Sequence, residues 1–253
     1  MNINQLYKEV GLEILYDGID REGRNGHTRS VFGKQIKYDM GTYGFPLLSM
    51  RKIFYKGVIG EFISFLQDAK TVKEFEANGC NYWKTWADID GNLKLDYPPR
   101  DQLDYVVKLL RHSPESRRIL IDLWNPENRG KLSLDPCHTQ YQFYVRNGKL
   151  DMIWNQRSVD YAVGMPSDFV LAGCWILMLC EECGFEPGVI TFNLGDTHLY
   201  HEHLDQFKAM MHRSTEALPV VGFSLMGVKD INVDSIRIRN YTPQLPIKFE
   251  LKE

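Results

Sequence analysis

Cys137 begins a stretch whose residue types predict a β-hairpin and could support nucleophilic chemistry. Apolar and polar residues alternate from Cys137 to an Asn147-Gly148 pair, and a second alternating run follows over Lys149–Ser158. Asn-Gly between two alternating runs is the strongest short-range signal for a hairpin. Pairing about this turn brings Arg157 level with Cys137, and a nearby guanidinium should lower the pKa of a thiol. The sequence therefore indicates either an activated thiolate at Cys137 or an inert buried cysteine.

Two carboxylates occupy positions that favour acid–base or electrostatic roles. Glu61 lies at helical spacing from its apolar neighbours in a predicted helix over residues 54–69, so it points along the buried face. Burial should raise the pKa of Glu61 and suit it to general acid or base catalysis, although a glutamate at the edge of the stripe would reach water. Asp168 falls in the predicted first turn of the apolar helix Phe169–Cys183, where the helix dipole favours an ionised carboxylate. Capping of that helix is the alternative role for Asp168.

Any anionic ligand must be held by local arginines, because the formal net charge is -3 and no overall basic field attracts nucleic acid. The Ser116-Arg117-Arg118 segment precedes an apolar strand and suits bidentate anion binding, although such pairs also occur on ordinary surfaces. The polar segment Asp20–Arg29 carries three arginines but lacks the Gly-Lys-Ser/Thr of a Walker loop. It predicts either an anion-binding loop or a solvated mobile loop.

Histidine and cysteine spacing gives no complete metal site. His198, His201 and His203 cannot all share one helix face, and the Cys180–Cys183 motif has no matching second pair, so we expect no metal. Five cysteines, an odd number, do not indicate a disulfide framework. No secretory signal is visible, and the longest apolar run, Phe169–Cys180, is too short to span a bilayer. We therefore expect a soluble protein of a reducing compartment, without a membrane partner.

The chain is predicted to form one domain over residues 1–253, because no repeat, low-complexity tract or linker interrupts it. Its hydrophobic content of 43% supports a sizeable core. Trp83 and Trp86 suit either core packing or stacking on a flat ligand. Hydrophobic periodicity predicts helices over residues 3–17, 54–69, 101–113 and 169–183, and strands over 29–39, 119–124, the hairpin and the tail 219–253.

In combination, these motifs resemble the thymidylate synthase family over nearly the whole chain, from the first helix to Phe249. Any single match is weak, but their number and order make the resemblance specific. The matching segments are Asp20-Arg21 with Phe32-Gly33, Gly44–Leu47, Glu61–Gln67, Trp83 with Trp86–Asp88, Ser116–Arg118, Trp124–Pro126, Pro136–His138, Gln156–Ser158 with Asp160, Gly164–Pro166 and Gly195–Tyr200. The resemblance implies an α+β fold, with a large mixed sheet packed with helices, and an obligate homodimer. It also implies a cytoplasmic enzyme, here of a bacterial cytosol, including that of a phage-infected host.

The resemblance further implies a pyrimidine 2′-deoxynucleoside 5′-monophosphate as substrate and 5,10-methylenetetrahydrofolate as one-carbon donor. Cys137 resembles the nucleophile that adds to carbon 6 of the pyrimidine, and Glu61 resembles the residue that moves protons with ordered water. The residues that match the family's phosphate-binding positions are Arg21, Arg157 and Ser158 from one subunit, with Arg117 and Arg118 from the partner. Gln156 belongs to the same substrate-binding motif as Arg157 and Ser158. The 3′-hydroxyl of the sugar is matched by His198 and Tyr200, and the folate by Trp83, Asp160 and Gly164.

One departure from the family pattern concerns the base. Synthases that use dUMP carry Asn where this chain has Asp168, and an Asn side chain accepts from N3–H of uracil while it donates to the 4-carbonyl. Cytosine presents an amino donor and a bare ring nitrogen instead. An ionised Asp168 can accept from that amino group and stabilise a proton on the ring nitrogen. A mismatched polar edge in a closed pocket costs about 1–3 kcal/mol per lost partner, so the sequence favours dCMP and resembles phage-type deoxycytidylate hydroxymethylases.

Two further departures concern the product. Lys94–Tyr97 runs directly into Pro98-Pro99 where the family has a longer insertion, and the chain ends in charged Glu250–Glu253 instead of an apolar tail that closes over the folate. A poorly sealed site admits water. Water adding to the exocyclic methylene gives a hydroxymethyl group, whereas hydride from the folate gives a methyl group. We therefore predict a dCMP hydroxymethyltransferase; the alternatives are a dCMP 5-methyltransferase that produces dihydrofolate and a synthase or hydroxymethylase that uses dUMP.

Two readings outside this enzyme class are also open to test. An inactive nucleotide- or RNA-binding homologue is opposed by the presence of Cys137, Glu61 and Arg157 together. A cysteine hydrolase that uses Cys137 and His138 is opposed by geometry, because adjacent residues of a strand point to opposite faces.

Overall fold

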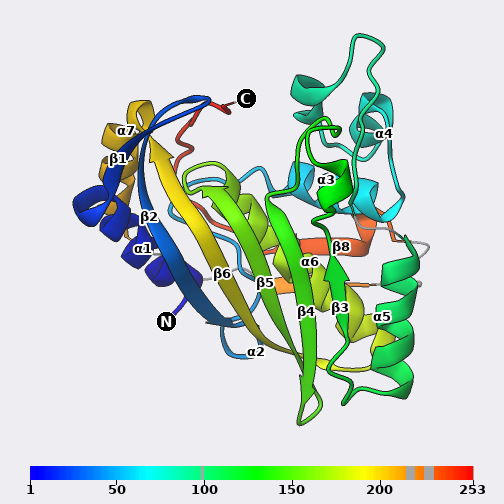
Figure 1. The fold of residues 1–253 in the computed structure, drawn as a ribbon. Helices are drawn as coiled ribbons and strands as arrows, with labels where there is room; N and C mark the ends of the chain where they lie inside the picture. Colours follow the sequence, from blue (N-terminus) through cyan, green and yellow to red (C-terminus); the bar gives the residue numbers. More distant parts are fainter. Residues whose placement is uncertain (98–99, 215–219, 225–230, 253) are drawn as a thin grey trace.

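A six-stranded mixed sheet forms the centre of the protein (Figure 1). The computed structural model describes residues 1–97, 100–214, 220–224 and 231–252. The strand order is β1-β2-β6-β5-β4-β3, and only the β5–β6 pair is parallel. A separate two-stranded sheet pairs β7 with β8. The strands are β1 (Ile19–Gly23), β2 (Gly26–Asp39), β3 (Leu120–Asp122), β4 (His138–Arg146), β5 (Lys149–Asp160), β6 (Glu186–Tyr200), β7 (Val220–Phe223) and β8 (Ile236–Arg239).

The predicted hairpin is formed by β4 and β5. Arg146 pairs with Lys149, and both turn residues have positive φ, 51° at Asn147 and 75° at Gly148. These values match the type I′ turn that Asn-Gly favours, because its twist fits the twist of the two strands. The pairing shifts by one residue between His138 and Gln140, which marks a β-bulge.

The longest helix, α6, connects the parallel strands β5 and β6 across one face of the sheet. Its 20 residues are long and apolar enough to span a bilayer, but 78% of the apolar window is buried inside the protein, as expected for a core helix. The helices are α1 (Ile3–Asp17), α2 (Met40–Tyr43), α3 (Tyr55–Leu66), α4 (Val72–Ala77), α5 (Arg100–His112), α6 (Gly164–Cys183) and α7 (Leu204–Met211), with short 3-10 turns η1 (Trp83–Trp86), η2 (Pro126–Asn128), η3 (His201–His203) and η5 (Val233–Ser235).

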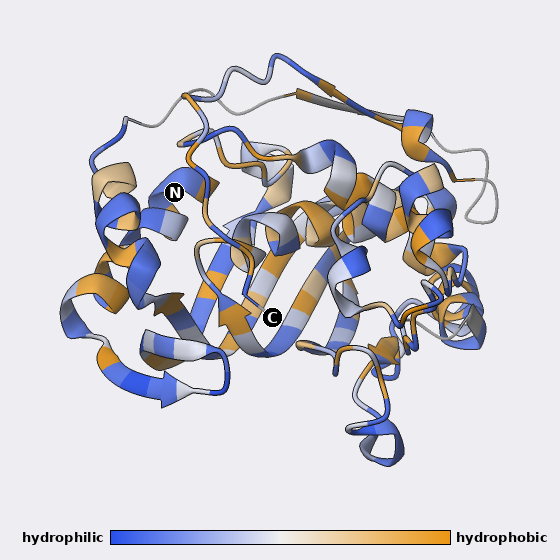
Figure 2. Ribbon diagram, turned by 90° about the horizontal axis from the view of Figure 1, so that it is seen from above, coloured by the Kyte–Doolittle hydropathy of each residue, from blue (hydrophilic) through white to orange (hydrophobic). Residues whose placement is uncertain are grey.

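The helices gather on one side of the six-stranded sheet. In Figure 1, α6 lies behind the sheet, α1 and α7 lie at the end that carries β1 and β2, and α5 packs beside β3. The strands in Figure 2 show hydrophobic and hydrophilic residues in turn, which is the pattern of a sheet with one buried and one polar face. This mixture of a sheet and packed helices confirms the expected α+β class.

Four boundaries differ from the sequence predictions. The segment Asp20–Arg29 is not a mobile loop, because β1 and β2 pair there as a hairpin. The apolar run of residues 169–183 is part of a longer helix that begins at Gly164, so Asp168 lies beyond the first turn and does not cap α6. In the tail, residues 240–252 form no strand, although residues 219–253 were expected to do so. The predicted strand 119–124 is shorter, since β3 covers only Leu120–Asp122.

Candidate active site

One cavity of about 510 Å³ collects most of the residues that the sequence singled out. Its wall is formed by α3, the segment before β4, the end of β5, the start of α6, the end of β6 and the C-terminal segment. Among the proposed site residues, the cavity is lined by Cys137, Glu61, Asp168, Arg157, Ser158, Gln156, His198, Tyr200, Trp83, Asp160 and Gly164. Arg21, Arg117 and Arg118 do not line it.

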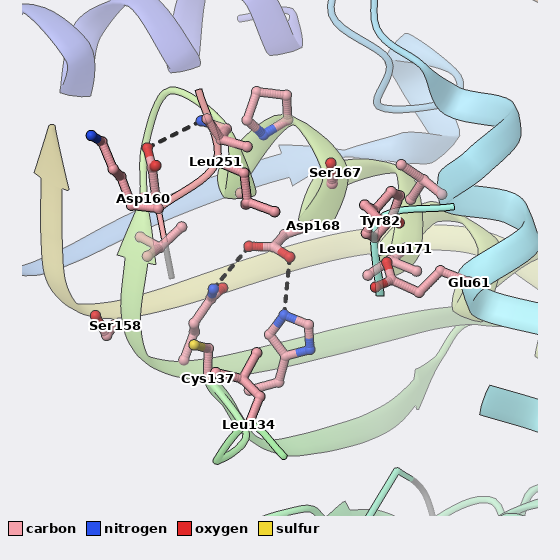
Figure 3. A pocket seen from close by; sticks show the side chains of 18 of the residues that line it. Glu61, Tyr82, Leu134, Cys137, Ser158, Asp160, Ser167, Asp168, Leu171 and Leu251 are labelled. Carbon is pink, nitrogen blue, oxygen red and sulfur yellow. Dashed lines mark hydrogen bonds and ion pairs between the residues drawn. The ribbon is translucent and has the colours of Figure 1, made fainter. Parts of the chain in front are cut away.

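Asp168 lies at the centre of this cavity and is 5% exposed (Figure 3). His138 Nε2 lies 2.9 Å from Asp168 Oδ1, and Gln156 Nε2 donates to Asp168 Oδ2 at 2.8 Å. The dashed lines at Asp168 in Figure 3 mark these two contacts. Each carboxylate oxygen therefore already faces one internal partner, and its remaining acceptor capacity is available to a ligand.

Glu61 reaches the cavity from α3 and is 8% exposed. Trp83 Nε1 donates to Glu61 Oε1 at 2.7 Å. Burial raises the pKa of Glu61 to about 7, although the Tyr82 hydroxyl and the Trp83 N–H act to lower it. The expectation of a buried carboxylate with a raised pKa is confirmed, and at neutral pH this group can either give or take a proton.

Cys137 is held in place through its backbone. The Arg157 N–H donates to the Cys137 carbonyl at 2.9 Å, so the two residues are level, as expected. The β-bulge that begins after His138 sets this alignment, because it shifts the pairing by one residue. Figure 3 shows the Cys137 sulfur on the side of the cavity that faces Asp168.

The expected low pKa of the Cys137 thiol is wrong. Burial raises the pKa of Cys137, and the charges of Asp168 and Asp135 raise it further, while Arg157 lowers it only in part. The guanidinium of Arg157 is turned toward the preceding loop, where its Nε donates to the Pro136 carbonyl at 2.9 Å. Arg157 therefore holds the loop that precedes Cys137, and its charge also lowers the pKa of the Cys137 thiol in part.

The arginines of the proposed phosphate clamp are only partly gathered in the cavity. Arg21 is mostly exposed and lies 3.5 Å from Asp196 Oδ2, while Arg117 and Arg118 are exposed in the turn before β3. Two other arginines, Arg24 and Arg51, do line the cavity and were missed. Arg24 is one of the three arginines of the Asp20–Arg29 segment, so the arginine content of this segment could have identified it as a cavity residue.

Two further residues missed as site residues lie close to the cysteine. His138 lines the same cavity as Cys137, so the expectation that the two point to opposite faces is wrong. Cys137 precedes β4, which begins at His138, and strand alternation therefore does not apply between them. Tyr97 also lines the cavity, is 8% exposed and stacks on Phe65 with ring centroids 4.5 Å apart. Its retention beside a shortened segment was the signal that could have identified it.

A buried carboxylate and two tryptophans form another part of the wall. Burial raises the pKa of Asp160, whose Oδ1 accepts from the backbone N–H groups of Ala162 and Val163 at 2.9 and 3.1 Å. The rings of Trp83 and Trp86 lie 5.2 Å apart and both line the cavity. The flat apolar surfaces of the two tryptophans suit a flat heterocycle, and Asp160 offers a carboxylate elsewhere on the cavity wall.

The C-terminal segment also reaches the cavity, which corrects the expectation of a tail without apolar contact. Phe249 and Leu251 line the cavity. Arg51 lies over the Phe249 ring at 5.2 Å, and the ring of His203 lies 5.3 Å from it on another side. Lys252 forms an ion pair with Glu202. Glu253, like Pro98-Pro99 of the shortened segment, lies outside the described residues.

The histidines near the end of β6 have separate environments. His198 Nδ1 lies 2.9 Å from Asp196 Oδ1, and His201 Nε2 lies 3.0 Å from Asp20 Oδ1. His203 is buried, and neither of its ring nitrogens has a hydrogen-bond partner among the residues that the structure describes. Within the described parts of the chain, no group of three or more His, Cys, Asp or Glu side chains is arranged to hold a metal ion.

The fold brings a cysteine, Cys137, and two buried carboxylates, Glu61 and Asp168, to one cavity. A family model described as thymidylate synthase matches residues 5–253. The chain belongs to the thymidylate synthase family. Members of the family are soluble cytoplasmic one-carbon transferases that act on carbon 5 of pyrimidine deoxynucleotides with methylenetetrahydrofolate as co-substrate, and they are generally obligate homodimers.

Proposed function

We propose that the protein is a dCMP hydroxymethyltransferase, which converts dCMP, 5,10-methylenetetrahydrofolate and water to 5-hydroxymethyl-dCMP and tetrahydrofolate. The observation that carries this proposal is the buried Asp168 carboxylate in the cavity, with Gln156 Nε2 at one oxygen and His138 Nε2 at the other. A carboxylate accepts from the amino group of cytosine but meets the 4-carbonyl of uracil without an intervening hydrogen. The proposed setting is a bacterial cytosol, including that of a phage-infected host, where the product would serve DNA modification.

In this mechanism the Cys137 sulfur bonds to carbon 6 of the base, and the electron pair of the double bond between carbons 5 and 6 moves toward the ring nitrogen N3. Asp168 stabilises the proton that N3 gains, because the adduct makes this nitrogen more basic. Carbon 5 would then bond to the one-carbon unit. Loss of the proton on carbon 5 and cleavage of the bond to the folate nitrogen would release tetrahydrofolate and leave an exocyclic methylene on the base. Water would add to this methylene, and the electron pair returned to the ring would expel the Cys137 thiolate from carbon 6. The raised pKa of Cys137 makes its deprotonation a step that the nearby cation Arg157 must favour.

Glu61 can supply the proton transfer that the addition of water requires. A buried carboxylate with a pKa of about 7 can accept a proton from water at neutral pH, so it can activate the water that adds to the exocyclic carbon. Trp83 and Trp86 would offer flat surfaces to the folate, and Asp160 and Gly164, which also line the cavity, would contribute to its binding.

The remaining binding roles are proposed by position. Arg157 and Ser158 lie at the cavity and would contact the phosphate, with Arg21 from the same subunit. Arg117 and Arg118 are exposed on this subunit and would reach the phosphate site of the partner. His198 and Tyr200 line the cavity and would contact the 3′-hydroxyl of the sugar, and Gln156 would act through Asp168.

The closest rival is a dCMP 5-methyltransferase, and one observation favours it. Phe249 and Leu251 contribute apolar surface to the cavity, and a cavity sealed against water would preserve an exocyclic methylene for hydride transfer. The two products differ in their folate by-product, because methylation oxidises tetrahydrofolate to dihydrofolate and hydroxymethylation does not.

The decisive experiment is the product mass after incubation with methylenetetrahydrofolate and either dCMP or dUMP. We expect a mass gain of one hydroxymethyl group on dCMP, no rise in dihydrofolate absorbance and little turnover of dUMP. Dihydrofolate that grows in step with dCMP consumption would favour the methyltransferase, and turnover of dUMP alone would refute the role of Asp168. Release of tritium from carbon 5 of dCMP should fall more than about a thousandfold in Cys137→Ala, which separates an enzyme from a binding protein.

A further inference from the structure

Two chains of hydrogen bonds end on the Asp168 carboxylate, one on each oxygen. In the first, Trp154 Nε1 donates to Gln156 Oε1 at 2.9 Å, and Gln156 Nε2 donates to Asp168 Oδ2 at 2.8 Å. In the second, the Tyr141 hydroxyl lies 2.9 Å from His138 Nδ1, and His138 Nε2 lies 2.9 Å from Asp168 Oδ1. All five residues are buried, with no more than 7% exposure. Water therefore does not replace any of these partners easily.

The direction of the first chain is fixed by Trp154. An indole N–H can only donate, so the atom of Gln156 that faces it must be the amide oxygen. The amide nitrogen of Gln156 then faces Asp168 and presents a hydrogen to Oδ2. A hydrogen on Oδ2 would point at the hydrogen of this N–H group, so Oδ2 carries no hydrogen and accepts the hydrogen bond.

The direction of the second chain follows from Tyr141. Burial raises the pKa of the Tyr141 hydroxyl well above its ordinary value, so the hydroxyl keeps its proton. Among the residues that the structure describes, His138 Nδ1 is the one hydrogen-bond partner given for this hydroxyl. The hydroxyl therefore donates to Nδ1, and a neutral imidazole that accepts at Nδ1 carries its hydrogen on Nε2. That hydrogen points at Asp168 Oδ1.

We propose that Tyr141 and His138 are positioning residues that hold Asp168 as an acceptor-only carboxylate, and that they thereby set the preference for a base with an amino group. With a hydrogen presented to each oxygen, the Asp168 carboxylate is held in one orientation and has little freedom to rotate. The free lone pairs of Asp168 then face the cavity, where they select a donor. The inference rests on the proposed function, because it assigns cytosine as the base that Asp168 reads.

Removal of the Tyr141 hydroxyl should weaken the preference for a base with an amino group, while the cavity still binds a nucleotide. His138 would then be free to carry its hydrogen on Nδ1 and to face Asp168 with a bare Nε2. Two acceptors in contact would be resolved by a proton on Asp168 or by rotation of its carboxyl group. A protonated Asp168 donates, and a donor is compatible with the 4-carbonyl of uracil.

The test compares equilibrium binding of dCMP and dUMP by calorimetry at one pH for the wild type and for Tyr141→Phe. The ratio of the two dissociation constants should fall roughly tenfold in Tyr141→Phe, the effect of one lost hydrogen bond between buried groups. Tyr144→Phe is the matched control, because Tyr144 lies on the same strand, β4, and is 57% exposed. Its ratio should equal that of the wild type.

Two further sets of variants separate positioning from a general loss of structure. In an Asp168→Asn background, Tyr141→Phe should leave the ratio unchanged, because its effect passes through the carboxylate. His138→Gln retains an N–H that can reach Asp168 and should keep more of the selectivity than His138→Leu does. Circular dichroism and urea unfolding identify any variant that has lost its fold.

The outcomes distinguish this inference from the function on which it rests. A folded Tyr141→Phe variant with an unchanged ratio would overturn the positioning role, while a wild-type preference for dCMP would still support the proposed function. A wild-type preference for dUMP would overturn the proposed substrate itself. An equal fall of the ratio in the Asp168→Asn background would also overturn the inference, because the effect would then not act through Asp168.

Discussion

At the scale of single residues, Glu61 determines how activity should depend on pH. Its pKa of about 7 means that the ionised form, the proton acceptor, decreases as the pH falls below 7. We expect kcat/KM of the wild type to fall by up to about tenfold per pH unit below this value. Glu61→Gln should lose about 10²–10⁴-fold in kcat and should lack this acidic limb of the profile. A profile of Glu61→Gln that still falls below pH 7 with the same slope would assign the limb to another group.

The same carboxylate should reduce the stability of the folded protein at high pH. Folding raises the pKa of Glu61 from 4.5 to about 7, so the folded protein binds this proton more tightly than the unfolded chain does. The stability of the fold that is linked to this proton is fully present below pH 4.5 and is lost as the pH rises through 7. This rise corresponds to about 3 kcal/mol, at about 1.4 kcal/mol per pH unit. We therefore expect Glu61→Gln to be more stable than the wild type at pH 8, by up to this amount, and similar to it near pH 4.5.

Urea unfolding at the two pH values provides the measurement, and the exposed Glu115→Gln serves as a control that should change stability at neither. Equal stability of Glu61→Gln and the wild type at pH 8 would contradict the raised pKa of Glu61.

Sequence reasoning identified some site residues well and others poorly, for physical reasons. Glu61 was found because burial of one helix face follows from local spacing, and its raised pKa follows from burial. The pKa of Cys137 was given the wrong sign, because sequence supplies the neighbouring cation but not the extent of desolvation. The contact of Asp168 with His138 joins a strand and a helix 30 residues apart, and no local pattern encodes it.

At the scale of elements, a close approach between strands β5 and β6 holds Arg157 in place. A Cβ atom at Gly195 would lie 2.4 Å from the Arg157 carbonyl oxygen, so no larger side chain fits without movement of the strands. We expect Gly195→Ala to destabilise the fold by about 1–3 kcal/mol, the usual range for overpacking. It should also slow the alkylation of Cys137, because a displaced Arg157 lowers the pKa of the thiol less.

Urea unfolding and the rate of iodoacetamide modification test the two effects. Gly23→Ala is the matched control, because the nearest atom to its added Cβ lies 3.5 Å away, which is an ordinary contact. If Gly195→Ala and Gly23→Ala behave alike, the close approach at Gly195 does not control the position of Arg157.

The elements that could be predicted were those with a strong hydrophobic pattern. The expected helix over residues 3–17 matches α1, and the Asn147-Gly148 hairpin matches β4 and β5. The strand β1 was missed because all five of its residues are exposed, so it carries no apolar alternation. The start of α6 was placed too late, because its first turn contains Gly164 and Pro166, and proline is tolerated in a first turn.

At the scale of the whole molecule, the face of the sheet opposite the helices is a surface suited to a partner. A row of side-chain hydrogen bonds crosses five strands there, from Gln35 through Asn193, Asn155 and Gln140 to Asp122. These residues are exposed or partly exposed, so the row lies at the surface of the subunit. Since the family is generally an obligate homodimer, this polar face is available for contact with a second subunit.

The sharing of arginines between subunits can be tested by mixing two inactive variants. Cys137→Ala lacks the nucleophile, and the double variant Arg117→Ala/Arg118→Ala lacks the proposed phosphate contacts to the partner. In a mixed dimer, one site combines the intact cysteine of one subunit with the intact arginines of the other. Random reassociation makes half of the dimers mixed, and each has one complete site of two, so about a quarter of wild-type activity should return.

Each variant dissociated and reassociated alone should stay inactive, and native mass spectrometry measures the fraction of mixed dimers. Activity that fails to return although mixed dimers form would place Arg117 and Arg118 in the site of their own subunit or outside it. Recovery in proportion to the mixed fraction would assign them to the partner's phosphate site, because no other pairing of the two variants restores a complete set of residues.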